Sequence, residues 1–157
     1  MDLCVEDSPD PLDAALLESQ VRRETVAASG HGDDMELAVF VREGGAIRAG
    51  VYGWTWGGCC ELESLWVEPS LRRQGLGSRL LAAAEAAALA RGCQQVVLFT
   101  YEFQAPGFYE RRGYELVGRV DGDPSGTAAL WFRKRLSVDA AATINDGTPT
   151  KAPPRDS

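Results

Sequence analysis

The residues Cys60–Arg91, CELESLWVEPSLRRQGLGSRLLAAAEAAALAR, decide the fold of this chain. They predict a buried strand, a short loop rich in arginine and glycine, and a long helix of alanine and leucine. Glycines let the loop turn where a Cβ would obstruct it, and Ser78 follows near the helix start. Because the first N–H groups of a helix lack partners and carry partial positive charge, the loop predicts a phosphate-binding site.

Two common phosphate-binding motifs do not fit this loop. A Walker loop needs a lysine directly after its last glycine, and no lysine follows Gly77. A dinucleotide fingerprint needs three spaced glycines, and the third is missing here. Glycine and arginine can also stand at a helix start only because they favour solubility. The prediction of a phosphate-binding site therefore needs further evidence from the rest of the chain.

The composition indicates one globular domain, and its charge disfavours some classes of partner. The chain has 157 residues, 45% hydrophobic and 25% charged, as is ordinary for one globular domain. Its net charge of −7 disfavours binding to nucleic acids and anionic membranes. We expect no membrane contact and a cytoplasmic location, because no long apolar run or signal-peptide pattern occurs.

The cysteines and the histidine favour no metal or redox chemistry. The four cysteines, two of them adjacent, show no C-x-x-C spacing, and we expect reduced structural thiols. His31 is the only histidine and lies in a stretch with loop composition. We therefore expect no metal site and no serine or cysteine catalytic triad.

Periodicity predicts a helix and a three-stranded meander before the loop, and a strand, a short helix and a hairpin after its helix. Because a helix connects the two strands around the loop, these strands are predicted to run parallel. The tail at 137–157 has few large apolar residues and is predicted to be disordered. The expected elements are a strand at 1–6, a helix from Pro11 towards Ala28, strands at 35–43, 47–56 and 60–67, a helix at 75–91, a strand at 95–100, a helix at 107–112, and strands at 114–120 and 127–136.

Two motifs in order resemble the GNAT superfamily of acyl-CoA-dependent N-acyltransferases, over roughly residues 34–136. The first is R-x-x-G-x-G at 72–77, preceded by LWVEP, and the second is APGFYERRGY at 105–114. The resemblance implies an α/β (α+β) fold with a mixed central sheet of six to seven strands, about four helices, and a splayed parallel strand pair that binds acetyl-CoA. It also implies one domain at 1–136, with the N-terminal helical segment over the acceptor side of the cleft.

By the same resemblance, the cleft holds acetyl-CoA as co-substrate. The backbone N–H of Val67 is expected to stabilise the oxyanion, and Tyr109 to protonate the leaving thiolate. Many members have an asparagine where this chain has Glu102, which puts one pantetheine contact in doubt and leaves Gln104 as a substitute. The expected cofactor-binding residues are Leu65, Trp66, Val67, Arg72, Arg73, Gln74, Gly75, Leu76, Gly77, Ser78, Gln104 and Phe108.

Two carboxylates are candidates for the base that deprotonates the acceptor amine. Alternation predicts that Glu61 and Glu63 share a face with Leu65 and Val67, where a carboxylate is costly unless a cleft solvates it. Glu63 is the first choice and Glu61 the second. The alternative is that either one pairs with an arginine, such as Arg48 or Arg119.

The predicted function is transfer of an acetyl group from acetyl-CoA to a primary amine of a small, cationic molecule, by direct attack in a ternary complex. The alternatives are a protein lysine or N-terminal acetyltransferase and a non-catalytic CoA-binding sensor. An open, acidic groove favours a protein acceptor, and a pocket closed by residues 12–33 favours a small molecule. Trp54, Trp56 and Trp66 are expected in core or dimer packing rather than in a cage for a cation, and a homodimer stays open.

Overall fold

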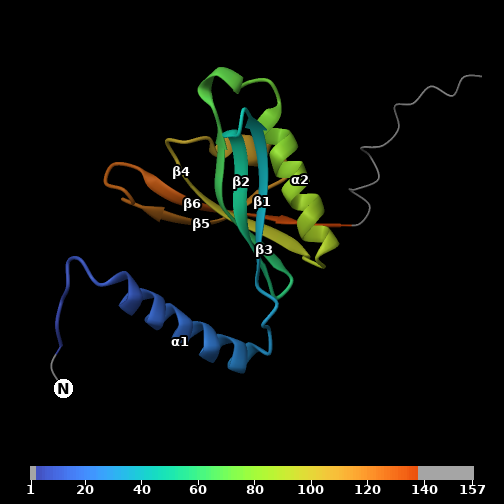
Figure 1. Ribbon diagram of the computed structural model, residues 1–157. Coiled ribbons are helices and arrows are strands. Elements are labelled where there is room, and N and C mark those ends of the chain that lie inside the picture. The colour runs from blue at the N-terminus through green and yellow to red at the C-terminus, as the bar shows by residue number, and fades with distance from the viewer. Residues whose placement is uncertain (1–2, 138–157) are drawn as a thin grey trace, which may run out of the picture.

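The computed structural model describes residues 3–137 as one mixed sheet with helices (Figure 1). Six strands lie in the order β1-β2-β3-β4-β6-β5, which confirms the predicted α/β fold and strand number. The prediction was about four helices, and the described residues form three α-helices and one 3-10 turn, η1. The elements are α1 (Pro11–Ser29), β1 (Met35–Glu43), β2 (Ala46–Trp56), β3 (Cys59–Val67), η1 (Pro69–Leu71), α2 (Leu76–Ala90), β4 (Gln95–Tyr101), α3 (Pro106–Glu110), β5 (Glu115–Asp121) and β6 (Ala128–Arg135).

Helix α2 packs on one face of the sheet and forms the core with it. The predicted stripe of small and branched residues is confirmed, since Leu80, Ala84 and Ala88 are buried and Leu76 packs at the edge. Alanine leaves little volume between helix and strand, so α2 lies close to the strands and buries their apolar side chains. Tyr114 and Phe132 join the same core from the last hairpin.

The parallel pair β3 and β4 is joined along only part of its length. The ladder runs from Cys59 opposite Gln95 to Leu62 opposite Leu98 and then stops. Beyond this point β3 continues beside β2 and β4 continues beside β6, so the two strands separate. The predicted splayed pair is therefore present, and its gap opens towards the start of α2.

The N-terminal region differs from the prediction in two respects. Residues 3–6 are not a strand in the structure, so the predicted strand at 1–6 is wrong for its described part. The helix is present as α1, but it buries no residue and stands away from the sheet (Figure 1). The expectation that this segment covers the acceptor side of its own cleft is therefore wrong, because contacts in the connection to β1 direct the helix elsewhere.

The face of the sheet opposite α2 is uncovered by the described part of the chain. Strand alternation places aromatic residues there, and Trp66 and Trp131 are 46% and 40% exposed. Trp54 and Trp56 are not in the core either. The prediction of core packing for these tryptophans is thus wrong, and dimer packing stays a prediction.

No helix within residues 3–137 combines the length and apolar character that a membrane crossing requires. The predicted disordered tail lies outside the described residues, apart from Ser137.

Candidate active site

The start of α2 exposes backbone donors that nothing in the helix uses. Gly75 precedes the helix with φ 77°, a left-handed conformation that favours glycine, and no side chain caps the helix start. The first bond into the helix runs from the Arg79 N–H to the Gly75 carbonyl oxygen, so the N–H groups of Leu76, Gly77 and Ser78 have no helical partner. Open space lies in front of the Gly75 Cα. These donors can receive an anion.

A cleft of about 1050 Å³ joins this helix start to the gap between β3 and β4. Glu63 and most of the residues expected to bind the cofactor line it, together with Tyr109. Glu61 and Gln74 do not, and the Gln74 side chain donates instead to the Ser70 carbonyl oxygen over 3.2 Å. The expected residues in the wall are Leu65, Trp66, Val67, Arg72, Arg73, Gly75, Leu76, Gly77, Ser78, Gln104 and Phe108.

The register of β3 decides which of its backbone groups face the gap. The Glu68 N–H donates to the Arg48 carbonyl oxygen over 2.9 Å, while Val67 lies opposite Ala49. In an antiparallel ladder, pairs that exchange hydrogen bonds alternate with pairs that do not, and Val67 and Ala49 form a pair of the second kind. The N–H and carbonyl of Val67 therefore point away from β2, towards the gap. Leu65 shares this orientation, whereas the backbone of Trp66 points at Gly50.

Arginine side chains complete the wall below Val67. Arg72 donates from Nε to the Val67 carbonyl oxygen over 2.9 Å, which leaves the N–H as the free polar group of that residue in the gap. Arg73 follows with φ 61°, an unusual conformation for a residue with a Cβ. Both side chains lie beside the start of α2, where their charge adds to that of the helix dipole.

A bulge at Glu63 overturns the predicted alternation. The register with β2 shifts between Tyr52 and Gly53, and Glu63 is the extra residue of β3. Leu65 and Val67 therefore lie on the α2 face, while Glu61 lies opposite Trp54 on the uncovered face. The expectation that both glutamates share a face with Leu65 and Val67 is wrong, because alternation cannot anticipate an inserted residue.

Glu63 is held on the cleft wall by the neighbouring strand. Trp54 donates from Nε1 to one carboxylate oxygen of Glu63 over 2.6 Å. The arginines named as alternative partners are engaged elsewhere, since Arg48 pairs with Glu43 and Glu68, and Arg119 pairs with Glu102 and Asp121. Within residues 3–137 neither candidate glutamate forms an ion pair with either arginine.

Tyr109 projects from α3 into the base of the gap. Its ring packs at 5.1 to 6.1 Å, centroid to centroid, against Phe108, Tyr114 and Phe132. Burial raises the pKa of the Tyr109 phenol above its ordinary value. The hydroxyl thus keeps its proton at neutral pH and can donate it into the cleft.

Glu102 and Gln104 have different surroundings. Glu102 is outside the cleft lining and forms an exposed, two-point pair with Arg119. Gln104 lines the cleft, and its Oε1 accepts from Thr100 Oγ1 over 2.7 Å and from the Tyr101 N–H over 3.0 Å. Because the oxygen is occupied, only the amide Nε2 of Gln104 remains as a donor to a ligand.

Arg111 and Arg112 also line the cleft, and sequence reasoning did not name them as site residues. Arg112 stacks over the Phe108 ring at 3.7 Å and donates to the Phe108 carbonyl oxygen and to Ser78 Oγ at the start of α2. A charged group so placed adds to the anion site. The available signal was the arginine pair inside the second motif, directly before Gly113.

The cysteines lie outside this arrangement. Cys60 and Cys93 are buried in the core, and burial raises the pKa of the Cys60 thiol to about 12. Such a thiol is unreactive at neutral pH, in agreement with the predicted structural role. Across residues 3–137 no group of three or more histidine, cysteine or acidic side chains is arranged to hold a metal ion.

Comparisons with known proteins agree with this geometry. The profile of the acetyltransferase (GNAT) family matches residues 5–114. The blasticidin-S acetyltransferase of Streptomyces morookaense is 40% identical over 98 residues, which cover 60% of this chain and 70% of that protein.

Solved structures share the fold. An Agrobacterium tumefaciens protein assigned to the acetyltransferases superposes with a TM-score of 0.82 at 28% identity, covering 87% of this chain and all of the other. An aminoglycoside 6′-N-acetyltransferase solved with coenzyme A shares the fold at 19% identity and a TM-score of 0.58, covering 86% and 97% of the two chains. The chain belongs to the acetyltransferase (GNAT) family and is an acyltransferase.

Proposed function

We propose that this protein transfers the acetyl group of acetyl-CoA to a primary amine of a small, cationic molecule, by direct attack in a ternary complex. The observation that carries the proposal is the cleft at the splayed strands, where unpaired backbone N–H groups of the helix start and of Val67 converge from two elements. Residues 1–136 act as one catalytic domain, and the cytoplasm, where acetyl-CoA is available, is the proposed compartment.

The pyrophosphate of acetyl-CoA is proposed to bind the N–H groups at the start of α2, with Arg72, Arg73 and Arg112 around it. This is supported by the uncapped helix start and by the arginines that surround it on an otherwise acidic protein. The pantetheine arm then lies along Leu65 and Val67, whose backbone groups face the gap.

The transfer step needs a base and an acid. The amine nitrogen attacks the thioester carbon, Glu63 accepts the proton of the amine, and the Val67 N–H stabilises the oxyanion. The C–S bond then breaks, and Tyr109 donates its proton to the thiolate. The proton that Glu63 has accepted returns to Tyr109 through solvent, which restores both side chains. Glu61, on the uncovered face outside the cleft lining, attracts a cationic acceptor in this proposal rather than accepting its proton.

The two glutamates can be separated by matched variants. Glu63→Gln removes the proton acceptor and keeps the bond from Trp54, so we expect kcat/KM to fall by about a hundredfold or more. Glu61→Gln is expected to change it by less than about tenfold, mainly through KM. Steady-state kinetics with one amine decide this, and equal losses in the two variants contradict the assignment of the base.

The proposed role of Tyr109 as the acid can be tested by removing its hydroxyl. Tyr109→Phe should lower kcat by about tenfold to a hundredfold and spare the affinity for CoA. Tyr114→Phe, which removes a hydroxyl that donates to Glu85 outside the cleft lining, is the control and should leave kcat unchanged. Because burial raises the pKa of Tyr109, the wild-type rate should not fall from loss of this proton below pH about 10.

The acceptor is tested by release of free CoA thiol from acetyl-CoA with a panel of amines. Blasticidin S is the first compound to include, because a relative is named for its acetylation. One observation favours a protein acceptor instead: residues 12–33 do not close the cleft within one chain, so the groove is open. Lysine-containing and N-terminal peptides therefore belong in the panel. Tight CoA binding without release by any amine or peptide would point to a sensor.

A further inference from the structure

Two tryptophans of β2 donate hydrogen bonds to different parts of the chain. Trp54 and Trp56 lie two residues apart on the uncovered face, outside the core. An indole N–H can only donate a hydrogen bond. Trp56 donates from Nε1 to the His31 carbonyl oxygen over 3.2 Å, whereas Trp54 donates to Glu63 Oε1 over 2.6 Å. Trp54 thus contacts the residue that is proposed as the base, although Trp54 itself is outside the cleft lining.

The bulge in β3 makes this contact possible. Glu63 is the extra residue of β3 at the register shift, so no residue of β2 lies directly opposite it. At the same point a Cβ on Gly53 would lie 2.0 Å from the Glu61 carbonyl oxygen. Only glycine therefore allows the two strands to approach so closely here. Gly53 and Trp54, adjacent in the chain, thus supply the space for the bulge and the donor for Glu63.

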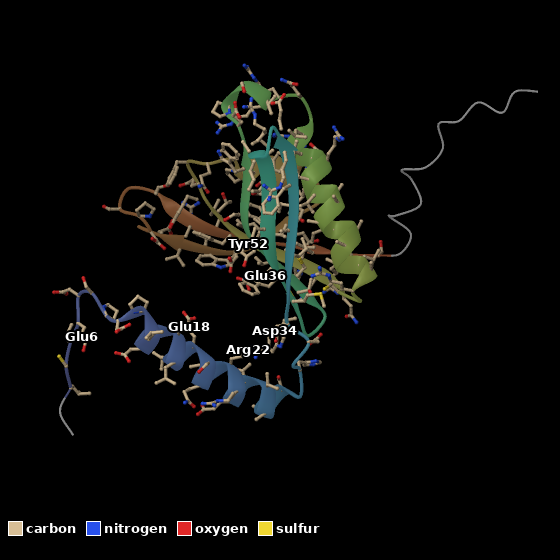
Figure 2. All side chains as sticks on the ribbon, in the orientation of Figure 1. Glu6, Glu18, Arg22, Asp34, Glu36 and Tyr52 are labelled. Carbon is tan, nitrogen blue, oxygen red and sulfur yellow. The ribbon has the colours of Figure 1, made fainter. Side chains whose placement is uncertain are left out.

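The ring of Trp54 is held in place by its own neighbours. It packs edge to face on Tyr52, with centroids 5.8 Å apart and an angle of 70° between the rings. The Tyr52 hydroxyl donates to Glu36 Oε1 over 3.0 Å, and Figure 2 shows these two side chains close together on β2 and β1. Burial and this bond raise the pKa of Tyr52, so its hydroxyl remains a donor at neutral pH. The contacts from Glu36 through Tyr52 restrict the motion of the indole, and its N–H stays directed at Glu63.

Glu63 needs such a contact to act as a base. Its side chain is long and exposed, so on its own it would occupy many rotamers. A general base must lie within about 2.6–3.2 Å of the atom whose proton it accepts. The bond from Trp54 occupies Oε1 and leaves Oε2 for the amine. Glu63 and Tyr109 also border one small cavity of about 10 Å³, so the proposed base and acid lie in the same part of the gap.

We propose that Trp54 is a positioning residue for the transfer reaction. Its N–H fixes one oxygen of Glu63 and thereby aims the other oxygen at the amine that attacks the thioester. Trp54 touches neither acetyl-CoA nor the acceptor in this arrangement and acts only through Glu63. The inference rests on the proposed function, in which Glu63 is the base. It gives Trp54 a role that neither core packing nor a cage for a cation describes.

The bond can be tested without any activity measurement, through the indole N–H signals of the isotope-labelled full chain in NMR. The four tryptophans give four such signals, and Trp54→Phe assigns the one that belongs to Trp54. Glu63→Ala removes the acceptor and should shift this signal. Glu61→Ala, which removes the carboxylate opposite Trp54 in the ladder, is the control and should shift it less. Equal shifts in the two variants, or no shift with Glu63→Ala, overturn the inference.

The role in transfer is tested by a double-mutant cycle. Trp54→Phe keeps an aromatic ring and removes the N–H, so we expect kcat to fall by about tenfold with an unchanged CoA affinity, which also shows that the cleft is intact. Trp56→Phe removes an N–H of the same strand that donates to the connection before β1, and should leave kcat unchanged. In a Glu63→Gln background, Trp54→Phe should lower kcat further by less than about twofold, because it acts only through the base. An equal loss in both backgrounds indicates a structural role and overturns the inference.

These measurements separate the positioning role from the proposed function. If Glu63→Gln is inactive and Trp54→Phe keeps the wild-type rate, Glu63 is the base and Trp54 does not position it. If the wild type transfers acetyl to no amine of the panel, the proposed transfer is refuted, and the positioning role with it, whatever the NMR signals show.

Discussion

The two long helices of this protein start in opposite ways. Asp10 caps α1, because its Oδ1 accepts the Leu12 N–H over 2.8 Å, whereas α2 begins at Gly75 with no side-chain cap. A capping side chain satisfies the helix donors and closes the terminus to anions, while an uncapped start keeps them for a ligand. Of these two helices, the one whose first N–H groups have no capping side chain, α2, is the one that begins at the cleft.

The helices also differ in packing. The 15 residues of α2 bury Leu80, Leu81, Ala84 and Ala88, and the 19 residues of α1 bury none. Both stretches predict a helix from the sequence. Helix formation and helix packing are therefore separate questions in this chain, and substitutions placed in each helix in turn can test the difference.

The largest expected effect concerns the two helix-terminal glycines. Gly75 at the start of α2 and Gly30 at the end of α1 have nearly equal φ, 77° and 75°, and open space beside each Cα. Glutamate strains the backbone at both positions, but only at Gly75 does it also bring a negative charge to the phosphate site. We expect Gly75→Glu to weaken CoA binding by about a hundredfold or more, through loss of charge-assisted hydrogen bonds.

Calorimetry with CoA measures this difference, and Gly30→Glu is the matched control, which should bind CoA like the wild type. Equal affinities for the two variants would show that the start of α2 does not hold the nucleotide.

The next effect concerns leucines in the two helices. Leu81→Ala should lower the free energy of unfolding by about 3 kcal/mol, since it opens a cavity under α2. Leu17→Ala, at an exposed position of α1, should cost less than about 0.5 kcal/mol in a dilute, monomeric sample. Urea unfolding at several protein concentrations checks both values. A cost for Leu17→Ala that grows with protein concentration indicates packing on a second copy.

The smallest effect concerns arginines near the two helices. Arg112→Met keeps much of the contact with Phe108 but removes the charge beside Ser78, and we expect about a tenfold loss of CoA affinity. Arg23→Met on α1 is the control and should leave the affinity unchanged. Raising the salt concentration should narrow the difference between the wild type and Arg112→Met, because the contribution is electrostatic. A salt-independent loss would indicate a packing defect instead.

Local pattern was enough to predict most of the secondary structure. The meander, the crossover helix and the last hairpin follow from apolar periodicity and glycine turns, and their bounds agree with the structure to within a few residues. Periodicity failed at Glu63, where a bulge adds a residue and moves Leu65 and Val67 to the other face. A bulge depends on the fit between two strands, so neither strand alone contains its signal.

The candidate site shows the same division. The loop at Arg72–Ser78 and Tyr109 could be named as candidates from two motifs, because the residues that form each lie close together in the chain. Arg112 was missed, since its position beside Ser78 depends on how α3, which carries Phe108, packs against the start of α2. The position of α1 was also missed, because contacts between residues 31–34 and the turn at Trp56 and Gly57 set its direction.

The sequence alone determined that a strand, an arginine- and glycine-rich turn and an alanine-rich helix follow one another, since each depends on residues within a few turns of the chain. It also determined the family, through two motifs in order. Only the tertiary structure decided where β3 leaves β4, which backbone groups face the gap, and which helix is left without a packing surface. These features arise where segments distant in the sequence meet, so their free energies depend on contacts that no local pattern encodes.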